Sequence, residues 1–195
     1  SNKMEVNLTK SLLNLSFIFS RTERLNSLLI HNRNEFNSLI KKIMFSTEEK
    51  VAICPGASNT WKRWPLENYI EIGKYLISKK FLPVFFLGPN EISLVNKLKK
   101  ELPEAIYPLQ SKYLKKPRPI HTILLAKHCK FGISNDTGCG HLLACSDLKL
   151  ISLFGNTNPK KFAPYNTIFK NIIISAEPFS KKKDISSIPI GVVIK

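Results

Sequence analysis

The amino-acid sequence predicts an α/β fold in which a Rossmann-like parallel sheet carries helices on both faces. Three observations predict it: the apolar runs are short and continuous, helical periodicities alternate with them, and loops rich in Gly, Pro and small polar residues follow them. Strands buried on both faces read as continuous apolar runs, and alternation with helices is typical of β-α-β units. With 195 residues, of which 43% are hydrophobic, the chain fits one globular domain.

Each expected element follows from its own stretch of sequence. Leu66–Ser78 has apolar residues at helical spacing, and Pro65 stands at a favourable first helical position. Asp184 is the expected cap of a last helix over 188–194, which Pro189 and Gly191 weaken. In order, we expect strands at 51–54, 83–87, 105–107, 131–134, 148–154 and 169–175, and helices at 66–78, 91–100, 120–128 and 140–145.

Residues 1–48 have a different character from the rest. They are polar and rich in Asn, and their apolar residues recur three to four positions apart, as at 36, 39, 40 and 43. This spacing predicts short amphipathic helices without a core of their own. We therefore expect residues 1–48 to be a helical linker and residues 49–195 to form the sheet domain.

The net charge is strongly positive, with 30 Lys and Arg against 14 Asp and Glu, which gives +16. Only five of these cations are Arg, and the abundance of Lys, Asn and Ile fits a compositional bias, so part of the charge is a solvated background. The remaining positive field attracts anions such as nucleotides, phosphorylated glycans or an acidic membrane. Nucleic acid is an alternative that the shortage of Arg disfavours, because phosphate and base contacts favour Arg.

Four cysteines, Cys54, Cys129, Cys139 and Cys145, show no CxxC spacing. We therefore expect a reduced, cytosolic protein rather than a disulfide framework. A zinc site among the His and Cys residues of 128–145 is disfavoured, because their spacings match no ligand pattern. No segment has the apolar length of a membrane span, and residues 12–19 lack the flanks of a signal peptide.

The first candidate loop runs from Pro55 to Pro65 and leaves the end of a strand. Small residues there let the backbone approach a ligand, hydroxyls and amides can donate to it, and Lys62 offers a charge for a phosphate. The following helix adds its positive end. The alternative is an ordinary strand-to-helix loop whose Trp residues pack on the domain.

The second candidate loop, residues 134–141, joins a strand to a helix. Thr137 and Gly138 place a hydroxyl and bare amides where phosphate binds at helix starts, and His141 could donate to an anion. Asp136 could accept hydrogen bonds from sugar hydroxyls. The alternative makes Asp136 or Thr137 a helix N-cap and His141 a half-buried residue. An aspartic protease is rejected, because its Asp-Thr-Gly motif is paired and lies among strands.

Two further strand ends carry candidate residues. Glu91, after Gly88 and Pro89, could bind ribose hydroxyls through its carboxylate, although such an acid is more often a helix-start residue. The loop 154–159 could line the same crevice, but we favour a simple turn there. GxxxxGK[ST], GxGxxG and GxSxG motifs are absent, which disfavours P-loop NTPases, ordinary Rossmann dehydrogenases and α/β-hydrolases.

Taken together, residues of about 50 to 175 resemble the C-terminal half of the ADP-heptose:lipopolysaccharide heptosyltransferases, glycosyltransferase family 9. The resemblance rests on four motifs at the expected strand ends, namely Lys-x-Trp-Pro at 62–65, Gly-Pro-x-Glu at 88–91, Asp-Thr-Gly-x-x-His at 136–141 and Phe-Gly-x-Thr-x-Pro at 154–159. Residues 6–48 resemble the segment that links the two halves in that family. The loop Lys112–Pro119 departs from the family in being more basic and Pro-rich.

The resemblance implies that this chain is the nucleotide-sugar-binding C-terminal domain of a GT-B glycosyltransferase. It also implies a role for each matching residue. Lys62 and Ser58 would bind the diphosphate, with Thr137, Gly138 and His141 contributing to the same site, Glu91 would bind the ribose, and Asp136 would contact the transferred sugar. The family needs no metal and no cofactor, since the nucleotide-sugar is a substrate. The catalytic base and the acceptor site belong to the family's N-terminal half.

The implied function is the donor-binding half of an inverting, metal-independent transferase that moves a heptose or related sugar from ADP-sugar to a lipopolysaccharide-core-type acceptor. The chain would be a fragment, a split-gene product or a remnant, inactive by itself, and a separate N-terminal acceptor domain or chain would be its partner. We expect it in the cytoplasm, with peripheral contact to the anionic inner membrane, and we expect no nucleic-acid partner. The alternative is a non-catalytic nucleotide- or anion-binding or assembly module with a basic surface.

Overall fold

The computed structural model of the protein describes residues 33–164 and 171–194. The chain divides into two compact units, residues 1–41 and 42–195, and the sheet lies in the second. Helix α2 (Arg33–Ile43) confirms a helix at the apolar positions 36–43, whereas the helices expected before residue 33 lie outside the described residues. The expected boundary between residues 48 and 49 stays a prediction.

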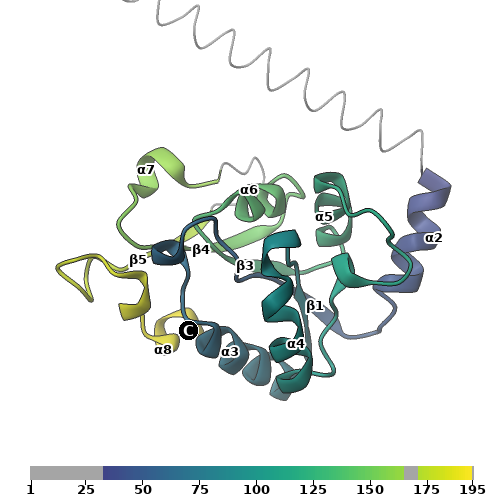
Figure 1. Ribbon diagram of the computed structural model, residues 1–195, viewed down its shortest axis with the longest axis horizontal. Helices are drawn as coiled ribbons and strands as arrows, with labels where there is room; N and C mark the ends of the chain where they lie inside the picture. The colour runs from purple at the N-terminus through teal and green to yellow at the C-terminus, as the bar shows by residue number, and fades with distance from the viewer. Residues whose placement is uncertain (1–32, 165–170, 195) are drawn as a thin grey trace, which may run out of the picture. The chain divides into compact units, whose positions relative to one another are not determined.

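A parallel sheet forms the centre of the second unit (Figure 1). Its strands lie in the order β2-β1-β3-β4-β5, and every pairing is parallel, which confirms the predicted class. The strands are β1 (Glu49–Cys54), β2 (Phe81–Phe85), β3 (Phe131–Asn135), β4 (Lys149–Phe154) and β5 (Ile172–Ser175). The strand expected at 105–107 is wrong in extent, because only a single bridge from Val84 to Ile106 forms there.

The expected helices follow the strands, with the predicted ends at 66–78 and shifted ends elsewhere, and a short helix at 159–162 was not expected. They are α3 (Leu66–Ser78), α4 (Ile92–Glu101), α5 (Pro119–Ala126), α6 (Gly138–Ala144), α7 (Pro159–Phe162) and α8 (Ile190–Ile194), with 3₁₀ turns η1 (Thr60–Lys62), η2 (Pro89–Glu91), η3 (Pro108–Gln110) and η4 (Ile185–Ser187). The role expected for Asp184 is wrong, since its carboxylate accepts from the Ser186 amide and caps η4 rather than α8. Among the described residues, no helix is long and apolar enough to cross a membrane.

The two faces of the sheet bury different side chains. Val51 and Ile53 belong to a large apolar core with residues of α3, α4 and α8. On the other face, where alternate strand residues point, Gly132 lies against Leu143 of α6. Figure 1 shows α3 and α8 on the side of the sheet opposite α6, so helices cover both faces as predicted.

The strand order places a crevice between the ends of β1 and β3. From β1 the chain moves outward to β2, and it then returns to the other side of β1 to build β3, β4 and β5. The loops that leave β1 and β3 therefore diverge, and ligands of open α/β sheets bind outside the carboxyl ends of the strands at such a reversal. The two loops singled out from the sequence, 55–65 and 134–141, both begin at this point.

Candidate functional site

The loop after β1 is held in place by its own side chains. Arg63 Nε donates to the carbonyl of Ala57 at 2.9 Å, and Trp64 Nε1 donates to the carbonyl of Ile188 at 3.0 Å. Trp64 is buried in the core, as the alternative interpretation of this loop predicted, whereas Trp61 is exposed. The buried ring anchors the loop, so that η1 presents Lys62 toward β3.

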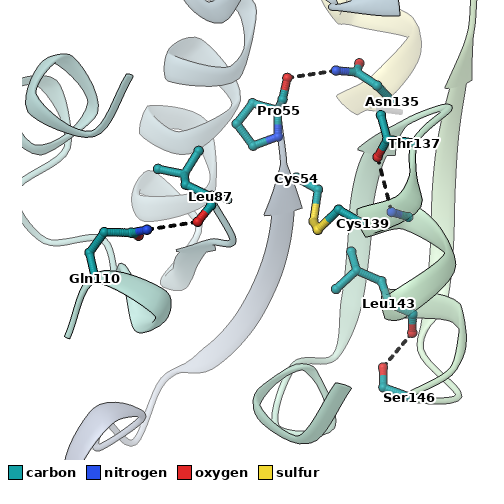
Figure 2. Close-up of a disulfide and its surroundings, with 10 residues drawn as sticks. Cys54, Pro55, Leu87, Gln110, Asn135, Thr137, Cys139, Leu143 and Ser146 are labelled. Carbon is teal, nitrogen blue, oxygen red and sulfur yellow. Dashed lines mark hydrogen bonds between the residues drawn. A yellow bond between two sulfur atoms is a disulfide. The ribbon is translucent and has the colours of Figure 1, made fainter. Parts of the chain in front are cut away.

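Asn135, the last residue of β3, is a positioning residue that the sequence analysis missed. Its Oδ1 accepts from the Tyr69 hydroxyl at 2.7 Å and from the Trp64 amide at 3.3 Å, while its Nδ2 donates to the carbonyl of Pro55 at 2.8 Å. Figure 2 shows the bond that spans from Asn135 to Pro55. Burial raises the pKa of Tyr69 well above its ordinary value, which keeps this hydroxyl a donor. The sequence offered one signal for this role, namely a side-chain amide, that of Asn135, at the end of a predicted strand.

Lys62 and Asp136 form an ion pair between the two loops, with Lys62 Nζ 2.7 Å from Asp136 Oδ2. Their side chains are 21% and 6% exposed, whereas every partner in the other ion pairs of the described residues is at least 39% exposed. Lys62 and Thr137 therefore lie at the same edge of the sheet, as predicted, because Thr137 is the next residue after Asp136.

Thr137 is the N-cap of α6, and its Oγ1 accepts from the Gly140 amide at 3.3 Å. The alternative interpretation of Thr137 as a cap is thus confirmed, and α6 begins two residues earlier than expected. Gly138 is exposed, and apart from its chain neighbours and its own helix backbone no described residue lies within 4 Å of the position that a Cβ would take. The backbone there is open to a ligand. His141 lies on the same short helix and is exposed.

A cavity of about 770 Å³ opens beside these groups. Ser58, Glu91, Thr137 and Gly138 line it, whereas Lys62, Asp136 and His141 do not. The cavity therefore brings together four of the seven predicted residues, and the Lys62–Asp136 pair lies next to Thr137 at its edge. Apolar side chains, which include Phe86, Val95 and Leu109, form part of its wall.

Among the described residues that line the cavity, Glu91 is the single acid, and Lys99 and Arg118 are the cations. Its carboxylate lies against two glycines, and a Cβ would stand 2.5 Å from its Oε1 if built on Gly56 and 2.7 Å from its Oε2 if built on Gly88. The loops after β1 and β2 therefore close tightly around this carboxylate, because these two positions lack side chains.

The loop 154–159 does not line the cavity, so it does not form the wall considered for it, and the simple turn that we favoured stays a prediction. Asn158 Oδ1 accepts from the Lys160 amide and caps α7. Gly155 packs closely against the backbone of 183–185, where a Cβ would stand 3.2 Å from the Lys183 carbonyl oxygen. By contrast, Pro117–Pro119 of the basic loop line the cavity wall.

The expectation of reduced cysteines is wrong for one pair, because Cys54 and Cys139 form a disulfide (Figure 2). It joins the end of β1 to the first turn of α6, and Cys139 also lines the cavity. The two cysteines are separated by 85 positions in the sequence, which explains why spacing did not predict the bond. Within the described ranges, no group of three or more His, Cys, Asp or Glu residues could hold a metal ion.

This arrangement suits a ligand that combines an apolar ring, a polyol and a strong anion. The apolar wall can bury a flat base, and a carboxylate can accept from two neighbouring hydroxyls. Lys62, the hydroxyl of Ser58 and the open backbone at Gly138 can bind the anion. The same groups could also bind a simpler phosphate, so the geometry defines a class of ligands.

Comparison with known proteins identifies a family for this chain. A family model described as "Glycosyltransferase family 9 (heptosyltransferase)" matches residues 24–188. The lipooligosaccharide heptosyltransferase 2 of Haemophilus influenzae is 26% identical over 115 residues, which make up 58% of this chain and 33% of that protein. The lipopolysaccharide heptosyltransferase 2 of Salmonella typhimurium is 27% identical over 110 residues, or 56% and 32% of the two chains.

Solved structures share the fold. A glycosyl transferase family 9 protein of Veillonella parvula superposes with a TM-score of 0.68 at 20% identity, over 83% of this chain and 48% of that one. The ADP-heptose lps heptosyltransferase II of Escherichia coli gives the same TM-score and identity, over 83% and 49%. The matched region thus spans about a third of the curated relatives and about half of the solved chains.

Proposed function

Because the chain belongs to glycosyltransferase family 9, the heptosyltransferase family, we propose that it is the donor-binding half of a GT-B glycosyltransferase. The enzyme would move a heptose, or a related sugar, from an ADP-sugar to a lipopolysaccharide-core-type acceptor, with inversion and without a metal. One observation carries this proposal: the Lys62–Asp136 pair lies beside Thr137 at the edge of a cavity that also contains Glu91, where the strand order reverses.

The nucleoside part of the donor would occupy the cavity. Its base would contact the apolar wall at Phe86, Val95 and Leu109, and the ribose hydroxyls would donate to Glu91. The close approach of Gly56 and Gly88 supports this role, because it holds the carboxylate at one place in the lining. The positive charges of Lys99 and Arg118 would attract the anionic donor toward this cavity.

The diphosphate would bind where the cavity meets the ion pair. Ser58, Thr137 and Gly138 face it from two loops, Lys62 lies next to it, and His141 on the first turns of α6 would support the same site. A charge-assisted hydrogen bond from Lys62 is worth about 1.5–3 kcal/mol. These groups would stabilise the negative charge of the departing nucleoside diphosphate, the electrostatic task for which other transferases use a divalent metal.

Asp136 would bind the transferred sugar, since it adjoins Thr137, does not itself line the cavity and bonds to Lys62. The catalytic base and the acceptor site would belong to a separate N-terminal domain or chain outside these 195 residues. In this proposal the assembled enzyme works in the cytoplasm, at the inner membrane surface, where its positive charge would contact anionic lipid.

Nucleotide preference tests the proposal directly. Calorimetric titration of the protein with ADP, UDP, GDP and inorganic phosphate, all at one ionic strength, should give the tightest binding with ADP. A site that binds ADP and inorganic phosphate equally well would instead indicate the alternative, a basic anion-binding module without a nucleotide-sugar donor.

A further inference from the structure

We propose that Trp61 and Phe162 form an aromatic platform on which the transferred sugar ring stacks. The inference rests on the proposed function and deepens it, because it assigns a sugar-contacting surface to two residues outside the four family motifs. Trp61 lies in η1 after β1, and Phe162 ends α7 after β4, so two separate strand ends supply the rings.

Both rings converge on the ammonium group of Lys62. The Nζ atom lies 5.3 Å from the centroid of the Trp61 ring and 5.9 Å from that of Phe162, and it is bonded to Asp136 at 2.7 Å. One shielded ion pair thus stands between two aromatic side chains. Cation–π attraction holds the rings around the lysine when no donor is bound.

The two rings are more exposed than the ion pair that they surround. Trp61 is 52% exposed and Phe162 is 42% exposed, whereas the other tryptophan, Trp64, is 1% exposed. A single exposed aromatic ring is ordinary on a protein surface. Here two of them flank a buried carboxylate at the carboxyl edge of the sheet, so a ligand that reaches Asp136 also meets aromatic surface.

The order of groups along the site matches the order within a nucleotide-sugar. The cavity would take the nucleoside, Thr137 and Gly138 line it, the Lys62–Asp136 pair adjoins Thr137 outside the lining, and the two rings lie around the lysine of that pair. Neither Trp61 nor Phe162 lines the cavity. A group attached to the outer phosphate would therefore reach the rings, whereas the base and ribose would not.

A sugar ring fits this combination chemically. It presents hydroxyls at its edge, which Asp136 can accept from and Lys62 can donate to, and it presents C–H groups on its faces. Aromatic faces bury such C–H groups and fix the plane of the ring. The platform would thus orient the sugar relative to the diphosphate and select for sugars with a flat apolar face.

Titration of the protein with ADP and with ADP-heptose tests the platform. Trp61→Ala and Phe162→Ala should each weaken binding of ADP-heptose by about five- to tenfold, the size expected for a lost aromatic contact, and should change ADP affinity by less than about twofold. Trp61→Phe keeps an aromatic face and should bind ADP-heptose nearly as the wild type does. Far-ultraviolet circular dichroism and thermal unfolding check that each variant is folded.

Tyr75→Ala is a matched control. Tyr75 is 37% exposed and also faces a lysine, with Lys79 Nζ 5.6 Å from its centroid, but it lies on α3 away from the cavity lining. This variant should bind both ligands normally. Losses that are equal for ADP and ADP-heptose, or absent for both, would overturn the platform. Failure of the wild type to bind ADP would instead overturn the proposed function, and the platform with it.

Discussion

Asn135 shows how one side chain can position two loops at once. It receives hydrogen bonds from Tyr69 and Trp64 and gives one to Pro55, so it joins α3 and the loop after β1 to the end of β3. Its loss would remove three hydrogen bonds that join the loop after β1 and α3 to the end of β3. The geometry of the site therefore depends on a residue that need not touch the donor.

Replacing Asn135 by Leu should lower the free energy of unfolding by about 2–4 kcal/mol, because a buried hydroxyl, an amide and a carbonyl all lose their partner. Urea denaturation measures the difference. Asn156→Leu is the control, since Asn156 is exposed in the loop after β4. A loss below about 0.5 kcal/mol for Asn135→Leu would contradict the anchoring role.

Gly56→Ala should weaken ADP binding by about three- to tenfold, the value of one displaced hydrogen bond, with little loss of stability. The added methyl would stand 2.5 Å from Glu91 Oε1, and the flexible carboxylate would move away from its place in the cavity. Calorimetry gives the affinity. Gly191→Ala, where nothing lies within 4 Å of the new carbon, should leave binding unchanged. Unaltered ADP affinity in Gly56→Ala would remove Glu91 from the site.

His121 should make stability depend on pH. Burial and then the charge of Arg118 lower its pKa from the ordinary 6.5, and its Nδ1 accepts from the Arg118 amide at 2.9 Å, which requires the neutral ring. The unfolded chain therefore binds the proton first as the pH falls. The contribution of His121 to the free energy of unfolding is therefore fully present above pH 6.5. It decreases as the pH falls from 6.5 toward the lower pKa of the folded state.

Urea denaturation between pH 5 and 8 measures how the free energy of unfolding depends on pH. His121→Asn keeps an acceptor for the Arg118 amide and should reduce the slope of stability against pH. Burial also lowers the pKa of His128, so His128→Asn should remove a further part of the slope. An unchanged slope in the double variant would show that other groups cause the pH dependence.

At the scale of elements, the strands were predictable because buried parallel strands are continuous apolar runs. The expected strand at 83–87 in fact begins at Phe81, since β2 lies at the edge of the sheet, where a proline such as Pro83 is tolerated. Contacts between distant segments were not predictable. Asn135 meets partners 66, 71 and 80 residues away, and periodicity carries no information on such pairs.

The disulfide between Cys54 and Cys139 should stabilise the packing of α6 against the end of β1. Because it closes a loop of 85 residues, the double variant Cys54→Ala/Cys139→Ala should lose about 2–4 kcal/mol of unfolding free energy relative to the oxidised wild type. Urea denaturation with a reductant supplies the control, since most of the difference should then vanish. Alkylation of Cys54 and Cys139 in the unreduced, denatured protein would contradict the bond.

At the scale of the whole molecule, topology explains why sequence motifs far apart form one site. The reversal of strand order between β1 and β3 brings the loops 55–65 and 134–141 to one edge, so motifs that follow strand ends could be assigned to a common crevice from the sequence alone. Side-chain placement was less predictable. Lys62 and Asp136 bond to each other, and His141 lies away from the cavity lining.

The net charge of +16 also acts on the whole molecule. This charge attracts any anion, so removal of any lysine lowers ADP affinity to some extent. The effect of removing Lys62 must therefore be compared with the effect of removing a lysine outside the site. Lys97 serves this purpose. It forms an exposed ion pair with Glu67 at 2.5 Å and does not line the cavity. Lys97→Ala therefore changes the net charge equally and leaves the site intact.

The most direct test of whether Lys62 and the Thr137 loop bind one diphosphate is the ADP affinity of Lys62→Ala. Calorimetry compares it with the affinities of the wild type and of Lys97→Ala at one ionic strength. Lys62→Met keeps much of the side-chain length and repeats the test, with thermal unfolding to confirm that each variant folds. We predict a loss of tenfold or more in both Lys62 variants, from a charge-assisted contact, and less than about twofold in Lys97→Ala. Equal ADP affinity in the wild type and the Lys62 variants would contradict the account.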